Sequence, residues 1–278
     1  MRLIHTLLFF IREDRIAEDK ILAAICLKSL EKSTYRDVVL YNQGCLTNEE
    51  LKEFLSQFNL NFTVIGDAQN TGTVVGRQRC FESIWETHPD TEYISEIHLD
   101  MLFPQHWEDP LVDYLDKNDE PMISCGIIDS QGVMGFIDSQ VHTIPADCTS
   151  FQEFLNSLKC DKIVYGFTNP CIHKSKIIQF TGGYNPRFLK GKHCFEDDSM
   201  LLGYFYYYGT RTNWKPKVNY HSVVYHQTAG QRLTVSNNVY MNFFGLIKQY
   251  GVMGLKHLSQ LHQSELHKQY FEQQYHNF

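Results

Sequence analysis

The first hundred residues alternate between short apolar stretches that suit β-strands and longer stretches in which apolar residues recur at helical spacing. The pattern predicts strands over 3–11, 37–41, 62–65 and 91–97, and helices over 17–30, 47–58 and 73–85. Strands that alternate with helices form parallel sheets, because each connecting helix packs back on the sheet. We therefore expect an α/β fold with a mostly parallel central sheet.

The second half of the chain is less regular. Asp109-Pro110 predicts the start of a helix, with Asp109 as its N-cap, and 122–128 reads as a further strand. Gly132, Gly135 and Pro145 then interrupt the pattern. Strand-like and helical stretches return over 162–168, 199–208 and 221–226. Irregular segments on a rigid frame commonly carry the variable side of a binding site. If the protein is an enzyme, we therefore expect this half to contact the acceptor substrate.

Composition narrows the class of protein. The chain has 278 residues, 43% of them hydrophobic, and a net charge of −7 without a cluster of basic residues, which disfavours nucleic acid as a partner. Its eight cysteines are scattered with no CxxC pair, which is typical of reduced, buried thiols in an intracellular protein. The apolar stretch at 3–11 is too short for a membrane span, and no longer one occurs. We expect a cytoplasmic protein without a transmembrane segment.

Two polar side chains follow the strand predicted over 91–97. His98 and Asp100 are two residues apart, so on an extended backbone they project from the same face. Ligands of open α/β sheets bind outside the carboxyl ends of the strands, and this pair lies at such an end. The pair suits Mg²⁺ or Mn²⁺, although two residues at a strand end can also simply satisfy each other.

Three consecutive acidic residues, Glu196, Asp197 and Asp198, stand at the start of the helix predicted over 199–208. Acidic residues at a helix start complement the helix dipole and cap free amides, which is the ordinary explanation. The functional alternative is a general base held ready for an attacking hydroxyl. His226, on the predicted strand at 221–226, is either a structural histidine or a ligand.

Several segments, in order, resemble family 2 glycosyltransferases of the GT-A fold. On the nucleotide side these are Asn42-Gln43-Gly44-Cys45, Asn70-x-Gly72 with Gly76-Arg77-Gln78, and His98-Leu99-Asp100, which resemble the nucleobase turn, the segment over the nucleotide and the Asp-x-Asp motif. On the acceptor side, residues 181–188 with Phe195-Glu196-Asp197-Asp198 resemble the Gly-Gly…Glu-Asp segment, and Val224-Tyr225-His226 resembles the closing strand. His98 stands where the family has the first Asp of its metal motif, and Asn42 replaces the Asp of the nucleobase turn.

The resemblance implies a GT-A domain over 1–230, with a nucleotide-sugar-binding half over 1–128 and an acceptor and catalytic half over 129–230, followed by a helical extension over 231–278. It implies hexosyl or N-acetylhexosaminyl transfer from a nucleotide-sugar donor, favouring a UDP-sugar, to a hydroxyl of a glycan, lipid-linked or protein-linked acceptor, with inversion. Asn42, Asn70, Gly72, Arg77, His98 and Asp100 would bind the nucleotide sugar. Asp100 and His226 would hold Mn²⁺ or Mg²⁺. Asp197 would be the base, with Glu196 or Asp198 orienting it or binding acceptor hydroxyls.

The C-terminal tail and two rival functions stay open. Leu255, Leu258 and Leu261 recur at helical spacing, which predicts a helical pair packed back on the domain. The alternatives are a homo-oligomer contact or a peripheral contact at the inner face of a membrane. The rival functions are a sugar nucleotidyltransferase and a catalytically silent glycan- or nucleotide-binding protein of the same fold.

Overall fold

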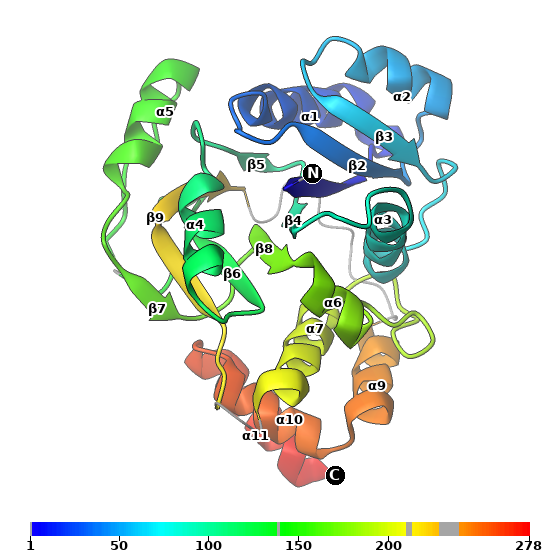
Figure 1. Ribbon diagram of the computed structural model, residues 1–278, viewed down its shortest axis with the longest axis vertical. Helices are drawn as coiled ribbons and strands as arrows, with labels where there is room; N and C mark the ends of the chain where they lie inside the picture. The colour runs from blue at the N-terminus through cyan, green and yellow to red at the C-terminus, as the bar shows by residue number, and fades with distance from the viewer. Residues whose placement is uncertain (1, 138–139, 210–212, 228–238) are drawn as a thin grey trace.

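A single mixed sheet runs through the computed structural model, which describes residues 2–137, 140–209, 213–227 and 239–278 (Figure 1). The sheet order is β3-β2-β1-β4-β8-β6-β9-β5, and β7 pairs with β9. The strands are β1 (Leu3–Phe9), β2 (Asp37–Asn42), β3 (Asn61–Ile65), β4 (Tyr93–Ile97), β5 (Met101–Leu102), β6 (Met122–Asp129), β7 (Ile163–Tyr165), β8 (Cys171–Lys174) and β9 (Lys217–His226). The first four strands are parallel, as predicted.

The helices of the first half also follow the predicted pattern. They are α1 (Ile16–Leu30), α2 (Asn48–Leu55) and α3 (Thr73–Thr87), and each connects two parallel strands. The start of α2 is fixed locally, because the Thr47 side chain accepts from the Glu50 amide while the Glu50 carboxylate accepts from the Thr47 amide. Local sequence and sheet pairing therefore agree in this half.

The middle of the sheet departs from the prediction. The four-residue strand β8 lies antiparallel between β4 and β6, and α6 (Ser175–Thr181) follows it, where the sequence predicts neither. So short a strand carries no periodic signal, and its pairing on both sides holds it in place. The other helices of this region are α4 (Asp109–Lys117) and α5 (Cys148–Ser157). The N-cap residue of α4 is Glu108, so the expected cap at Asp109 is one residue out.

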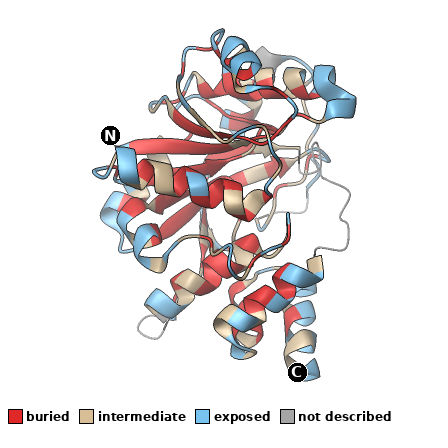
Figure 2. Ribbon diagram, turned by 90° about the vertical axis from the view of Figure 1, so that its right-hand side faces the viewer, coloured by how far each residue is buried: buried red, intermediate tan, exposed pale blue. Residues whose placement is uncertain are grey.

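Alternating side chains of the strands feed two cores on opposite faces of the sheet. On β1, Leu3 and Leu7 pack with α1, α2 and α4, whereas Ile4 packs with α3 and the later helices. The central strands are buried, β3 and β7 are partly exposed, and the exposed residues of the helices lie on their outer sides (Figure 2). Of the described thiols, Cys26, Cys80, Cys125 and Cys171 are buried as expected, whereas Cys160 and Cys194 are half-buried and Cys45 is exposed.

The C-terminal part is helical and packs back on the domain. After α7 (Glu196–Tyr204) and the π-helical turn η2 (Phe205–Gly209) come α9 (Val239–Tyr250), α10 (Met253–Leu261) and α11 (Glu265–Asn277), below α6 and α7 in Figure 1. Three described helices thus replace the predicted pair. Leu255 and Leu258 of α10 are buried in the same core as Leu202 of α7. The predicted domain boundary at 230 lies outside the described residues, and none of the described helices has the length and apolar character needed to cross a membrane.

Candidate active site

A cavity of about 570 Å³ opens at the carboxyl ends of β1 and β4, facing the start of α7. Seven of the predicted site residues line it: Asn70, Arg77, His98, Asp100, Glu196, Asp197 and His226. Asn42, Gly72 and Asp198 are not among its lining residues. The tertiary structure thus brings the predicted cation ligands and the predicted base to one cavity, although about 100 residues separate them in the chain.

Strand pairing brings Asp100 and His226 together. Met101 of β5 lies opposite His226 of β9, and the amide of Gln227 donates to the Asp100 carbonyl oxygen at 2.9 Å. The Asp100 Oδ1 is 3.3 Å from His226 Nε2. Burial alone would raise the pKa of Asp100, but the hydrogen bond and charge of His226 outweigh it and hold that pKa below its ordinary value.

His98 completes this group. One potential ligand atom from each of His98, Asp100 and His226 lies within 4.8 Å of the others. Burial, reinforced by the positive charge of Arg77, lowers the pKa of His98 to about 3. A neutral imidazole keeps a nitrogen lone pair, so it can bind a metal ion or accept a hydrogen bond.

Asp197 faces the same cavity from the first turn of α7. Cys194 and Phe195, just before it, both have positive φ angles (79° and 64°), so a tight left-handed turn leads into the helix. Burial raises the pKa of Asp197 well above its ordinary value, and the negative charges of Glu196 and Glu96 raise it further. Its Oδ2 accepts a weak hydrogen bond from Asn169 Nδ2 at 3.4 Å. A carboxylate with a raised pKa in a cavity is a candidate proton acceptor.

The two neighbours of Asp197 face different surroundings. Glu196 pairs with His193 through a 2.9 Å contact, and its Oε2 is buried with no hydrogen-bond partner in the described part of the chain. Asp198 instead contacts His262 Nε2 at 2.7 Å and so connects α7 to the C-terminal helices. We therefore keep Glu196 in the candidate site and assign Asp198 to the packing of the extension, against the expectation that it orients the base.

Arg77 lines the cavity but is almost completely buried. Its Nε is 3.1 Å from Glu96 Oε2, and its guanidinium donates to the carbonyl oxygens of Thr6 (2.9 Å) and Ile97 (2.8 Å). Only 2% of Arg77 is exposed. Most of its donors are therefore engaged in holding the ends of β1 and β4 together.

The predicted nucleotide loops are shaped by their own side chains. Asn42 is fully buried and donates to the Leu46 carbonyl oxygen and to Asn48, so it stabilises the turn from within. Asn70 Oδ1 accepts from the Gly72 amide at 3.0 Å. Gly72 has φ +88°, and a Cβ there would lie 2.7 Å from the Cα of Lys192, so only glycine allows this approach of the two loops.

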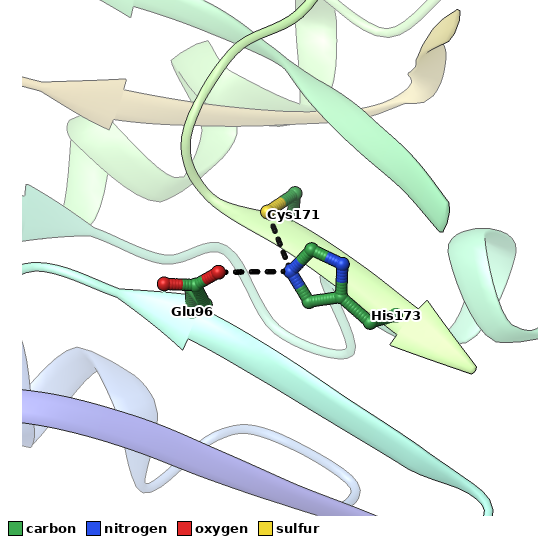
Figure 3. A group of neighbouring side chains, drawn as sticks. All are labelled: Glu96, Cys171 and His173. Carbon is green, nitrogen blue, oxygen red and sulfur yellow. Dashed lines mark hydrogen bonds and ion pairs between the residues drawn. The ribbon is translucent and has the colours of Figure 1, made fainter. Parts of the chain in front are cut away.

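A second polar group includes Glu96, which also lines the cavity. Glu96, Cys171 and His173 also present ligand atoms within 4.8 Å of one another, and His173 Nε2 lies 3.0 Å from Glu96 Oε1 and 3.2 Å from Cys171 Sγ (Figure 3). The Tyr184 hydroxyl donates to Glu96 at 2.9 Å, and the Arg77 guanidinium neutralises the Glu96 carboxylate. Glu96 thus has a resident cation, and we interpret the group as a hydrogen-bonded network.

The cavity is also lined by residues for which the motifs imply no individual role. They are Gln43, Glu96, Phe136, Asn169, Tyr184, Lys192 and His193, among others. A glutamate inside the apolar strand 93–97 is the one signal that could have drawn attention to Glu96. Tyr204 of α7 is not a cavity residue: it is fully buried, with its hydroxyl 2.8 Å from His173 Nδ1, and belongs to the core.

Comparison with known proteins identifies the fold. No family model matches the sequence, and no curated protein matches it significantly. Among solved structures, S. aureus TarS 1–349 is 13% identical, with a TM-score of 0.57 over 100% of this chain and 71% of that one. The complex of TarS 1–349 with UDP-GlcNAc is 12% identical, with the same TM-score over 98% and 70%, and a complex with UDP is equally similar. The chain therefore has a GT-A-type glycosyltransferase fold.

Proposed function

We propose that this protein transfers a sugar from a UDP-sugar to a hydroxyl group of a glycan, lipid-linked or protein-linked acceptor, with inversion at the anomeric carbon. One observation carries the proposal: Asp100 and His226, the proposed cation ligands, line the same cavity as Asp197, the proposed base. The structurally similar TarS has been solved with UDP and with UDP-GlcNAc, which supports a uridine nucleotide as the donor.

The donor would lie across the carboxyl ends of the parallel strands. Asn70 and Gln43 line the cavity on this side and offer amide groups for the nucleoside. Among the described lining residues, the cationic side chains are Arg77 and Lys192. Arg77 is engaged with Glu96 and backbone carbonyls, whereas Lys192 is exposed. We therefore assign the contact with the diphosphate to Lys192, in place of the direct role expected for Arg77.

The residues around Asp100 fit a divalent cation. Asp100 and His226 would hold Mn²⁺ or Mg²⁺, since carboxylate and imidazole are ligands that Mn²⁺ accepts and the pair is already in contact. The ion, when bound, supplies Lewis-acid stabilisation of the charge on the departing diphosphate.

Asp197 would act on the acceptor. As the acceptor oxygen attacks the anomeric carbon, the bond from that carbon to the diphosphate oxygen breaks, and UDP leaves. The acceptor hydroxyl proton passes to Asp197, whose raised pKa makes its carboxylate a stronger base than that of an ordinary aspartate. Glu196, paired with His193, supports the orientation of this carboxylate. A single displacement of this kind inverts the anomeric centre.

A binding and product assay tests the proposal. The full chain is screened by thermal shift against UDP, GDP, CMP and UDP-sugars, with and without Mn²⁺, because a ligand that binds only the folded state raises the melting temperature. We expect the largest shift from uridine nucleotides with Mn²⁺, and release of UDP from the donor. Preference for GDP or CMP would contradict the donor assignment. Release of pyrophosphate would indicate a nucleotidyltransferase, and binding without turnover a silent protein.

A further inference from the structure

We propose that His98 is a third metal ligand and that His98, Asp100 and His226 together select a transition-metal ion, such as Mn²⁺ or Co²⁺, over Mg²⁺. This inference deepens the proposed function, on which its biological meaning rests. It concerns His98, which stands where the motif described above has an aspartate. An aspartate there would offer oxygen to the ion, whereas His98 offers nitrogen.

The geometry brings three donors to one point. Asp100 Oδ1 and His226 Nε2 are 3.3 Å apart, and a ring nitrogen of His98 lies with them inside a 4.8 Å group. The rings of His98 and His226 have centroids 5.3 Å apart and an interplanar angle of 73°. Metal–ligand bonds of about 2.1 Å place neighbouring donor atoms roughly 3–3.4 Å apart. Small rotations of the side chains would therefore close the three donors on one ion.

The backbone around these residues is held in place. The His98 amide donates to Met101 Sδ at 3.4 Å, and Cys26 Sγ donates to the His98 carbonyl oxygen at 3.3 Å. On the other side, the β5–β9 pairing fixes His226 opposite Met101. The three side chains thus come from segments whose separation is set by hydrogen bonds and strand register.

The chemistry of the donors gives the selectivity. Mg²⁺ is a hard ion that prefers oxygen ligands in octahedral geometry, whereas Mn²⁺, Co²⁺ and Zn²⁺ accept imidazole. Two of these three side chains offer nitrogen. The two imidazoles are neutral ligands, and Asp100 contributes one negative charge. A divalent ion together with these three ligands therefore has a net charge of +1. That residual charge faces the cavity and favours an anionic ligand such as a diphosphate.

The surroundings leave coordination positions open. All three residues line the cavity, so positions not taken by protein face the space where a ligand would lie. The Glu96–Cys171–His173 group differs, because Arg77 already lies 3.1 Å from Glu96 there. Of the two clusters of potential ligands found in the described residues, the one with an open side is therefore the better cation site.

Direct metal binding, measured without nucleotide, tests the proposal. The metal-stripped full chain is titrated calorimetrically with Mn²⁺, Co²⁺ and Mg²⁺, and the Mn²⁺ complex is examined by pulsed EPR for coupling to imidazole nitrogen. We expect Mn²⁺ and Co²⁺ to bind about 100-fold more tightly than Mg²⁺, and coupling from two imidazoles.

Substitutions separate a ligand from a neighbour. His98→Ala should lower Mn²⁺ affinity about 10–100-fold and leave coupling from one imidazole, and His98→Asp should narrow the preference for Mn²⁺ over Mg²⁺ to under about 10-fold. His276→Ala, an exposed histidine of α11, is the control and should change neither. Circular dichroism melts show whether each variant folds.

Three outcomes overturn the inference. The first is equal affinity of the wild type for Mn²⁺ and Mg²⁺, and the second is unchanged nitrogen coupling in folded His98→Ala. The third is a His98→Ala variant that loses UDP affinity but keeps its metal affinity, which would make His98 a nucleotide contact. If the protein binds Mn²⁺ selectively but transfers no sugar, only the proposed function is contradicted and this inference stands.

Discussion

The carboxyl group of Asp197 combines three features that set its chemistry. It is half-buried, it lies two residues after the positive-φ turn at Cys194 and Phe195, and it is near Glu196 and Glu96, whose charges oppose its ionisation. Burial would be costly for a structural carboxylate without a strong partner, and its hydrogen bond from Asn169 is long, at 3.4 Å. This combination is typical of a group kept for proton transfer.

Replacing Asp197 with Asn should abolish transfer while leaving the nucleotide site intact. We expect kcat to fall about 10²–10⁴-fold, since the acceptor proton loses its base, and the dissociation constant of UDP to change less than about threefold. Steady-state kinetics and calorimetry measure the two effects. Asp198→Asn is the matched control, because its contact with His262 places it outside the cavity; kcat should be nearly unchanged and only stability should fall. A large loss of UDP affinity in Asp197→Asn would instead make Asp197 a structural cap.

Glu196 should control the pH at which Asp197 works. After burial, the charge of Glu196 is the next cause of the raised pKa of Asp197, so neutralising it in Glu196→Gln should lower that pKa. Because the base must be deprotonated, the acidic limb of the pH profile of kcat/KM should move to lower pH. Glu49→Gln, an exposed residue of α2, should leave the limb in place. An upward shift, or none, would argue against this coupling.

Pairing of short elements decides which side chains meet. Strand β5 has two residues, yet its antiparallel pairing with β9 places Asp100 against His226 across a sequence separation of 126 positions. Helix α7 has a similar dual role. Its first turn carries Glu196 and Asp197 at the cavity, while Leu202 and Asp198 contact the C-terminal helices. The extension therefore supports the helix that carries the proposed base.

Truncating a core leucine of α10 should destabilise the whole domain. Leu258 is fully buried with α7 residues, so Leu258→Ala should lower the free energy of unfolding by about 2–5 kcal/mol. Leu266→Ala in α11, 74% exposed, is a control of the same residue type and should cost less than about 0.5 kcal/mol. Urea denaturation measures both. A separate early transition in the wild type would show that the extension folds independently, contrary to this packing.

At the scale of the whole molecule, the sheet separates the two larger cores, and the candidate active-site cavity opens at the carboxyl ends of β1 and β4. A buried acidic group also lies away from that cavity. Glu108 is fully buried, accepts from the Tyr35 amide at 3.0 Å, and has a second oxygen with no hydrogen-bond partner among the described residues. Burial raises its pKa from 4.5 to about 7.

This shift predicts a pH-dependent stability. The folded state keeps the Glu108 proton up to about pH 7 and the unfolded state only to about 4.5, so the contribution of Glu108 is complete below pH 4.5 and is lost as the pH rises through 7. The difference corresponds to roughly 3 kcal/mol. Glu108→Gln should therefore be more stable than wild type at pH 8 and similar to it near pH 5, as measured by denaturation at both. A stability gap between the two proteins that does not change with pH would contradict the burial of an ionisable Glu108.

The sequence by itself determined the elements and their order. Apolar periodicity and the Thr47–Glu50 capping box depend on neighbours within a few residues, so the strands and helices up to residue 97 could be predicted close to their ends. The positions of Asp100 and Asp197 after a strand and at a helix start were also local features, and they correctly indicated two groups at the carboxyl edge.

Only the tertiary structure decided what each of these side chains faces. Asp198 meets His262, Arg77 meets Glu96, and β8 enters the sheet between β4 and β6; each outcome depends on segments brought together from elsewhere in the chain. The physical reason is that burial and hydrogen bonding set the role of a polar group, and both depend on distant contacts that no local pattern contains.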